Sequence, residues 1–569
     1  MTLPEFKHRI LVLFSLVLAL PASLLAQEAD LILHNGEFYT PDGWQQAVAI
    51  RNGVIVALGA DSDVMTLAGT NTQRLNLAGA TVFPGLHDLH VHPMGAGLNQ
   101  LQCNFPQGSS SEQLLAAVAA CVAERHDGEW ITGGQWDASS FGSQPMHRRM
   151  LDEVAPDNPV SLVDISGHSI WVNSRALELA GISNATLAPE GGVIEKDASG
   201  DVTGVLRESA SGLVRGIIPP ESPAQIKEAL YWASQTMLGH GITAFTDAGV
   251  SGVNMQAFAE LSDEGRLKQR VRTCMMWRGL AFGGSDGSGM PEYVAMRNLY
   301  ARERLHPDCI KIALDGVPTD GHTAAMVEPY ADTDAVGGNR DRGILMVPAD
   351  ELATLVTTWD AMGFVVKMHA AGDGAVRAGL DAIAAAREAN GFTGRLHEVA
   401  HNSFVQMDDI RRARSIGATF EMSPYIWFPN PIIPDIAKAV GDERMLRWTP
   451  VKDAIDAGAL VVPGSDWPVV PQVNPWIGIE TLVTRQAPGG IGEPLGAVER
   501  ITLEQAIELY TVNASREFGN RHRTGSIATG MLADLIVLDR NPFSIPITEV
   551  HQTQVRQVYI EGELVHELD

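Results

Sequence analysis

The stretch PGLHDLHVHP occupies residues 84–93 and follows the apolar run 78–83. It places His87, Asp88, His90 and His92 close together at the end of a predicted strand. Side chains alternate along a strand, so His90 and His92 share one face with Asp88, whereas His87 lies on the other. The two histidines are therefore a candidate metal-binding pair. We expect Asp88 to support them and His87 to serve in packing.

Short apolar runs alternate with amphipathic helices through the middle of the chain. Besides the run that ends at 88–92, strands are predicted at 241–247, 271–277, 309–315, 364–369, 396–401, 418–423 and 459–466. Helices are predicted between them, for example at 373–388 and 407–416. This α/β order predicts a TIM-like (β/α)8 barrel, whose functional groups lie at the C-terminal ends of its strands.

Both ends of the chain read as short antiparallel strands. Residues 30–40 and 47–59 alternate in polarity, and 531–540 and 555–568 form a matching set. We therefore predict a small β-sandwich domain built from both termini, from residues 27–84 and 520–569, around a barrel domain at 85–519. The segment from about 97 to 240 is too long for one β/α connection, which predicts an inserted cap subdomain near the active-site mouth.

The first residues have the order of a secretory signal peptide, at 1–26. Lys7 and Arg9 precede the apolar run 10–20, and Pro21 and small residues lead to a predicted cleavage site after Ala26. The alternative is a membrane anchor, but the run is short and is followed by proline. We expect a periplasmic or secreted protein with no stable membrane anchor after cleavage.

The composition limits the partners. The chain has 569 residues, 68 acidic and 41 basic, with a net charge of −27. Nucleic acids bind basic surfaces, so we expect no nucleic-acid partner. A small-molecule substrate is expected instead, with a homodimer as a candidate assembly.

The cysteines do not form a thiolate zinc motif, since the chain has four and no CxxC pair. Cys103 and Cys121 flank a predicted loop and helix. They either form a disulfide or remain two buried thiols, and the sequence favours neither alternative. Cys274 and Cys309 lie in apolar strand-like runs and are expected as unbridged core residues.

Polar side chains occur near the C-terminal ends of several predicted barrel strands, although buried parallel strands should be apolar. They are His90, His92, Lys311, His369, His401 and Asp466. A single strand histidine is usually a core residue, but several at one rim indicate a site. Imidazoles and a carboxylate suit Zn²⁺ or a similar divalent cation.

Ordered motifs extend this pattern along the chain. They include PGLHDLHVH, GGQWDAS at 133–139, PVSLVDISGHSIWVNSRALELAGI at 159–182, KIALDG at 311–316, HAAGDGAV at 369–376 and GSDWPV at 464–469. With these motifs the chain resembles the amidohydrolase superfamily, and specifically its third family, the YtcJ-like metal-dependent hydrolases that include N-substituted formamide deformylase.

The resemblance implies roles for the matching positions. His90 and His92 would bind the more buried metal, which Asp466 also approaches, and His369 and His401 would bind a second ion. Lys311 stands where related barrels offer a carbamylated lysine that bridges two metals. A free ammonium group cannot bind a cation, so the alternative is a lysine paired with Asp315 or another carboxylate.

The chain departs from the family pattern near two of these residues. Ala400 stands where an acidic residue often precedes the strand histidine, and Gly374 replaces a usual arginine. His397 is a rival ligand in the sequence HEVAH, but His401 is preferred because it lies nearer the C-terminal end of the strand.

Five residues are predicted to contact substrate. His168, Trp136 and Trp171 belong to the expected cap, and His322 and Trp467 belong to the barrel. The alternative for each is a purely structural role in a loop or core.

Together these features predict an exported metal-dependent amidohydrolase. A metal-activated hydroxide would attack a non-peptide C–N bond, amide or formamide-like, and Asp466 would accept its proton and deliver it to the leaving amine. The alternatives are an esterase or lactonase on the same site, a non-catalytic barrel with a binding role, and a metal-dependent isomerase or deaminase.

Overall fold

The computed structural model describes residues 28–106, 109–136, 141, 146–164, 169–189, 192–277, 290–319, 322–332, 341–426 and 433–568. The expected signal peptide lies outside this part of the chain. Within the described ranges, no helix has both the length and the apolar character that a membrane crossing requires.

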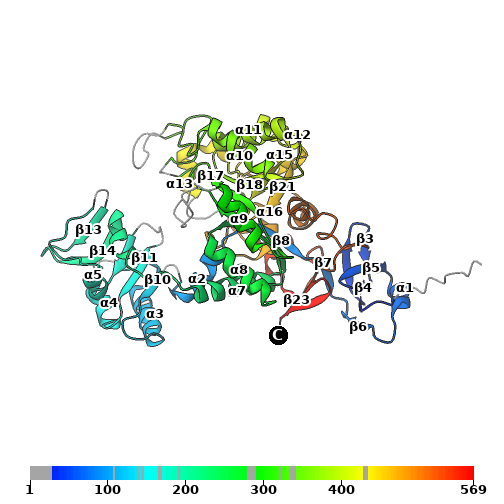
Figure 1. Cartoon of the computed structure of the whole chain (residues 1–569), viewed down its shortest axis with the longest axis horizontal. Coiled ribbons are helices and arrows are strands. Elements are labelled where there is room, and N and C mark those ends of the chain that lie inside the picture. The colour runs from blue at the N-terminus through cyan, green and yellow to red at the C-terminus, as the bar shows by residue number, and fades with distance from the viewer. Residues whose placement is uncertain are drawn as a thin grey trace, which may run out of the picture.

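The middle of the chain forms an eight-stranded parallel sheet in sequential order, which confirms the TIM-like barrel (Figure 1). Its strands are β8 (Leu86–Val91), β15 (Ile242–Val250), β16 (Arg270–Met276), β17 (Leu305–Ala313), β18 (Val365–Ala370), β19 (His397–His401), β20 (Ala418–Met422) and β21 (Leu460–Pro463). The segment after β21 reaches β8 through hydrogen bonds from Asp466 N to His90 O (2.7 Å) and from His92 N to Trp467 O (2.8 Å), so the barrel is nearly closed.

Helices cover the outer side of this barrel. They include α2 (Pro93–Leu101), α7 (Pro223–Gly239), α8 (Gly252–Asp263), α9 (Met290–Tyr300), α10 (Ala349–Ala361), α11 (Asp373–Asn390), α12 (Met407–Ile416), α13 (Ile433–Val440), α15 (Val451–Asp456) and α16 (Pro475–Thr484). The C-terminal part of the barrel domain adds α17 (Leu503–Glu508), the π-helix η5 (Leu509–Asn513) and α18 (Ala514–Glu517).

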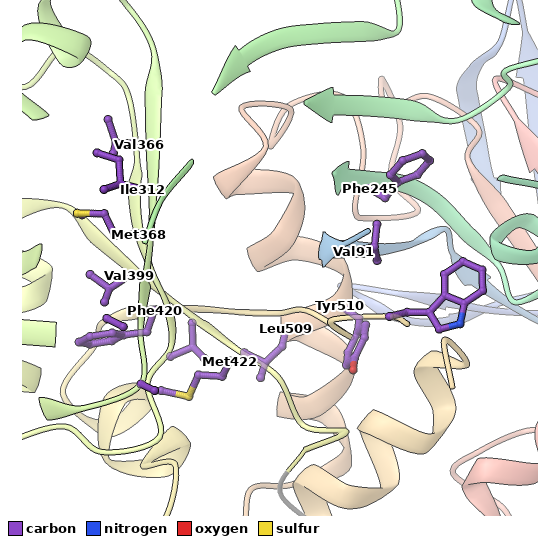
Figure 2. Close-up of a cluster of buried hydrophobic side chains, with 14 of the residues drawn as sticks. Val91, Phe245, Ile312, Val366, Met368, Val399, Phe420, Met422, Leu509 and Tyr510 are labelled. Atoms are coloured by element: carbon purple, nitrogen blue, oxygen red, sulfur yellow. The ribbon is translucent and has the colours of Figure 1, made fainter. Parts of the chain in front are cut away.

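Strand alternation separates the apolar core from the polar interior of the barrel. Figure 2 shows Ile312, Val366, Val399 and Phe420, from β17 to β20, in one apolar cluster that also includes residues of the surrounding helices. The chain neighbours of these residues project to the opposite face of the sheet, toward the barrel interior; they are Lys311, Lys367, Glu398 and Glu421.

The two ends of the chain form a pair of sheets, and one of these sheets contains strands from both ends. One has the order β5-β4-β1-β6 and the other β24-β23-β22-β7-β2-β3. In Figure 1 the C-terminal β23 therefore lies close to the N-terminal β7. The strands are β1 (Leu31–His34), β2 (Glu37–Thr40), β3 (Gly43–Gln45), β4 (Ala47–Arg51), β5 (Val54–Gly59), β6 (Gln73–Asn76), β7 (Thr81–Pro84), β22 (Leu535–Leu538), β23 (Val555–Ile560) and β24 (Glu563–Glu567).

The insertion between α2 and α7 has a sheet of its own, drawn in cyan in Figure 1. Its strand order is β13-β14-β12-β11-β10-β9. The elements are β9 (Cys103–Asn104), α3 (Ser111–Ala123), β10 (Ile131–Trp136), α4 (Arg148–Val154), β11 (Val160–Asp164), β12 (Ser169–Val172), α5 (Ser174–Leu179), β13 (Gly192–Lys196), β14 (Val202–Glu208) and α6 (Gly212–Arg215).

The cysteines form two disulfides. Cys103 on β9 is bonded to Cys121 on α3, which resolves the alternative left open for that pair. Cys274 and Cys309 are buried in the core, as expected, but they are also bonded to each other, which was not expected. The reason is strand register, because the two residues are direct partners on the adjacent strands β16 and β17.

Candidate metal centre

The predicted ligands come together at the C-terminal ends of the barrel strands. His90 lies on β8, His92 precedes α2, Lys311, His369 and His401 lie on β17, β18 and β19, and Asp466 follows β21. The ring centroids of His90 and His401 are 4.6 Å apart, and those of His369 and His401 are also 4.6 Å apart. Lys311 Nζ is 3.2 Å from His90 Nε2. Asp466 Oδ1 is 3.3 Å from His92 Nε2 and 3.7 Å from His90 Nε2.

Asp88 fixes the two chain segments that carry this cluster. Its Oδ1 accepts hydrogen bonds from His90 N (3.1 Å) and from Ser465 N (3.0 Å). Burial raises the pKa of the Asp88 carboxyl to about 6, against the lowering effect of these hydrogen bonds. His87 lies away from the cluster, in edge contact with the ring of Phe518, and burial lowers its pKa to about 3.

Glu421 orients His90. Its Oε2 is 2.6 Å from His90 Nδ1, which leaves Nε2 of the same ring facing Asp466 and Lys311. A carboxylate on one imidazole nitrogen is the usual support for a metal ligand at the other. Glu421 was not among the predicted site residues, although an acidic residue inside the apolar run ATFEM was a signal for it.

Asp315 orients His369 in the same way. Its Oδ1 is 3.0 Å from His369 Nδ1 and accepts a hydrogen bond from Ala371 N (3.0 Å). Its Oδ2 accepts from Ala325 N (3.0 Å) and from Gly372 N (2.9 Å). Asp315 is thus fully engaged with His369 and the backbone, rather than with Lys311 as the alternative proposed.

The two histidines of HEVAH have different surroundings. His401 has a positive φ of 77°, which turns the end of β19 inward, and its Nδ1 is 3.4 Å from Ser423 Oγ. His397 instead faces the outer helices, where its Nε2 is 2.9 Å from Asp360 Oδ1. The structure therefore brings His401, and not His397, to the cluster.

Two histidines of the cluster, His90 and His401, favour the neutral form that binds a cation. Burial, together with the charge of Lys311, lowers the pKa of His90 well below its usual value. Burial, with the neighbouring His369, has the same effect on the pKa of His401. Burial raises the pKa of the Glu421 carboxyl to about 8, although the charge of Lys367 opposes this rise.

The predicted substrate residues that the structure describes lie in different parts of the molecule. His168 lies outside the described residues. Trp136 (3% exposed) and Trp171 (0%) are buried in the hydrophobic core of the inserted subdomain. His322 stacks on Tyr330 and its Nε2 is 2.6 Å from Asp332 Oδ1. Trp467 packs against Trp232 of α7, with ring centroids 5.9 Å apart.

A cavity of about 1100 Å³ lies elsewhere, between the inserted subdomain and the segments that join it to the barrel. Its lining includes Asn99, Arg125, Trp130, Arg215 and Glu221. None of the six clustered residues lines this cavity, so it is separate from the candidate metal centre.

The donor set fits a divalent cation. The ligand atoms of His90, His92 and Asp466 all lie within 4.8 Å of one another. Neutral imidazoles and a carboxylate are the ligands that Zn²⁺ prefers, and His369 and His401 offer further imidazoles beside them. The carboxylates of Glu421 and Asp315 complete the arrangement, because a ring that is held at Nδ1 presents Nε2 to a metal.

Fold and site together define a barrel protein with a candidate metal centre at the C-terminal rim, and comparisons with known proteins agree. A model of the amidohydrolase family matches residues 73–566. YtcJ of Bacillus subtilis (strain 168) is 30% identical over 548 residues, which cover 94% of this chain and 99% of YtcJ. The N-substituted formamide deformylase of Arthrobacter pascens is 27% identical over 556 residues, which cover 95% of this chain and 99% of that enzyme. The chain therefore belongs to the amidohydrolase family, as its motifs predicted.

A solved structure shares the whole fold. The crystal structure of an uncharacterized metal-dependent hydrolase from Pyrococcus furiosus aligns with a TM-score of 0.71 and 24% identity. The alignment covers 90% of this chain and 100% of that one. The overall fold of the chain thus occurs in this hydrolase as well.

Proposed function

We propose that the protein is an exported metal-dependent hydrolase that cleaves a non-peptide C–N bond, amide or formamide-like, in a small molecule. The position of Asp466 carries this proposal. Its Oδ1 is 3.3 Å from His92 Nε2, so a proton-accepting carboxylate lies directly beside the metal-binding imidazoles. The formamide deformylase among the relatives supports an N-substituted formamide as the first substrate class to test.

The residues have distinct tasks in this reaction. His90, His92 and Asp466 would hold one cation, and His369, His401 and a carbamylated Lys311 would hold a second. The cation, for which we propose Zn²⁺, supplies Lewis acidity and makes hydroxide available near neutral pH. Asp466 accepts a proton from the attacking water as its oxygen bonds to the carbonyl carbon. It then donates this proton to the nitrogen as the C–N bond breaks, which releases a carboxylic acid and an amine.

Two features support export. The segment 1–26 has the order of a signal peptide, and the disulfides Cys103–Cys121 and Cys274–Cys309 suit an oxidising compartment. Fractionation of cells that produce the full chain tests this. We expect the mature protein in the periplasm or medium, beginning at residue 27, and uncleaved protein in the cytoplasm would contradict it.

The catalytic proposal is tested with N-substituted formamides, amides and the matching esters as substrates. Asp466→Asn should lower kcat for the formamide by about 100-fold or more, because it removes the proton acceptor. Asp456→Asn is the matched control, since this carboxylate lies on the surface of α15 and pairs with Lys452. Full activity of Asp466→Asn would overturn the assignment, and hydrolysis of esters alone would indicate an esterase.

A further inference from the structure

A second lysine lies beside Lys311. Lys311 on β17 and Lys367 on β18 are direct register partners in the parallel sheet. Neighbouring strands lie about 4.8 Å apart, and residues in register project to the same face. Both side chains therefore enter the barrel interior, where Lys311 is 5% exposed and Lys367 is 0% exposed.

The two lysines differ in their partners. Lys367 Nζ forms an ion pair with Glu398 Oε2, and both side chains are fully buried. For Lys311, by contrast, no carboxylate of the described residues lies within ion-pair distance, and its Nζ lies 3.2 Å from His90 Nε2. A protonated Lys311 would thus be a buried cation beside another cation, which is a costly arrangement.

We propose that Lys367 is a positioning residue whose ammonium group stabilises an anionic carbamate on Lys311. The inference rests on the carbamate of the proposed function and explains why it would form at this lysine. The neutral Nζ of Lys311 bonds to the carbon of carbon dioxide, one C=O pair becomes the carboxylate charge, and one N–H proton leaves to solvent. The repulsion between two cations is thereby replaced by an attraction between the carbamate and Lys367.

Glu398 holds Lys367 in place for this task. Glu398 lies on β19, which neighbours β18, and its direct register partner on β18 is Lys367. The Lys367–Glu398 pair is therefore built into the sheet. Because the pair is neutral as a unit, it can remain buried before and after Lys311 gains the carbamate.

Carbon-13 NMR of the metal-loaded protein in labelled bicarbonate tests the proposal. The wild type should give one carbamate carbonyl signal that is absent from Lys311→Met. The double variant Lys367→Met/Glu398→Gln leaves no unpaired buried charge. Its half-saturating bicarbonate concentration should rise about tenfold or more, since a nearby opposite charge typically shifts such equilibria by at least one logarithmic unit. In the double variant, the amount of metal bound per chain should fall together with the carbamate signal.

Three further variants make the result specific. Lys367→Gln can still donate a hydrogen bond to Glu398, and it replaces the double variant if that variant does not fold. It should show the same rise in half-saturating bicarbonate concentration. Lys367→Arg retains the positive charge and should stay within about threefold of the wild type. Arg270→Met/Asp534→Asn removes a different buried ion pair, which does not involve Lys367 or its partner Glu398, and should leave the carbamate unchanged.

The outcomes separate this inference from the proposed function. A folded double variant or Lys367→Gln with wild-type carbamate saturation would overturn the role of Lys367. Amide hydrolysis by a metal-loaded wild type without a carbamate signal would overturn the inference and leave the hydrolase intact. A carbamate that depends on Lys367, in a protein without hydrolytic activity, would support the inference and contradict the proposed function.

Discussion

His90 Nδ1 lies 2.6 Å from Glu421 Oε2, and the two side chains are 1% and 0% exposed. This contact joins β8 to β20 across the place where the barrel closes. It determines which nitrogen of His90 faces the cluster, because a ring held at Nδ1 presents Nε2 to a metal. The metal centre therefore depends on a carboxylate that is not itself among the predicted ligands.

Replacement of Glu421 by glutamine should weaken metal binding. We expect Glu421→Gln to lower zinc affinity by about 10- to 100-fold, measured by competition with a chelator, because the orientation of His90 is lost. Asp409→Asn is the control, since Asp409 is a buried carboxylate on α12 that pairs with Arg377 and Arg412. Equal affinity in Glu421→Gln and the control would contradict the role of Glu421.

The histidines at the two ends of β19 should respond differently to substitution. His401→Asn should reduce the bound metal, with little change in the fold. His397→Asn should keep the metal but lower the free energy of unfolding by about 1–3 kcal/mol, because the charged hydrogen bond to Asp360 is lost. Metal analysis and urea denaturation of both variants check this, and loss of metal from His397→Asn alone would reverse the ligand assignment.

The stability contributed by Asp360 should depend on pH. Burial raises the pKa of its carboxyl, but hydrogen bonds from His397, Thr393 and Asn390 outweigh burial and hold the pKa well below its usual value. The contribution is therefore present above the unfolded pKa, about 3.9, and is lost as pH falls toward the folded pKa.

Asp360→Asn should accordingly be less stable than the wild type by about 2 kcal/mol at pH 7, with a smaller difference at pH 3. Urea denaturation at both pH values measures the difference. Asp408→Asn, at a side chain that is 90% exposed, should differ by less than about 0.5 kcal/mol at either pH. A difference for Asp360→Asn that grows toward pH 3 would show that the carboxyl is neutral in the folded protein.

The disulfide inside the barrel should contribute to stability. Cys274→Ala/Cys309→Ala should lower the free energy of unfolding by about 2–4 kcal/mol, because the unfolded chain gains freedom. Peptide mapping without reductant should recover the two cysteines in one linked peptide pair. Free thiols at both positions in protein purified from an oxidising compartment would contradict the pairing.

The candidate metal cluster could be predicted from the sequence because its residues interrupt apolar strands at their C-terminal ends. His90, Lys311 and Asp466 are recognisable in this way without any knowledge of their neighbours. Parallel strands in sequential order then bring these ends together, so the predicted barrel also predicted the cluster.

Other features depend on contacts that strand patterns do not contain. Glu421 meets His90 only because the sheet curves until β20 approaches β8, and Cys274 meets Cys309 only through the register of β16 and β17. Trp136 and Trp171 are predicted to contact substrate, and the structure places both in the hydrophobic core of the inserted subdomain. The aromatic character of the two side chains does not by itself distinguish a substrate contact from a core residue.

Anomalous X-ray scattering at the zinc edge, from crystals of metal-replete protein, tests the central claim most directly. We expect a peak in contact with Nε2 of His90, Nε2 of His92 and Oδ1 of Asp466, with a second beside His369 and His401. The absence of any peak at these atoms in a protein that hydrolyses its substrate would contradict this claim.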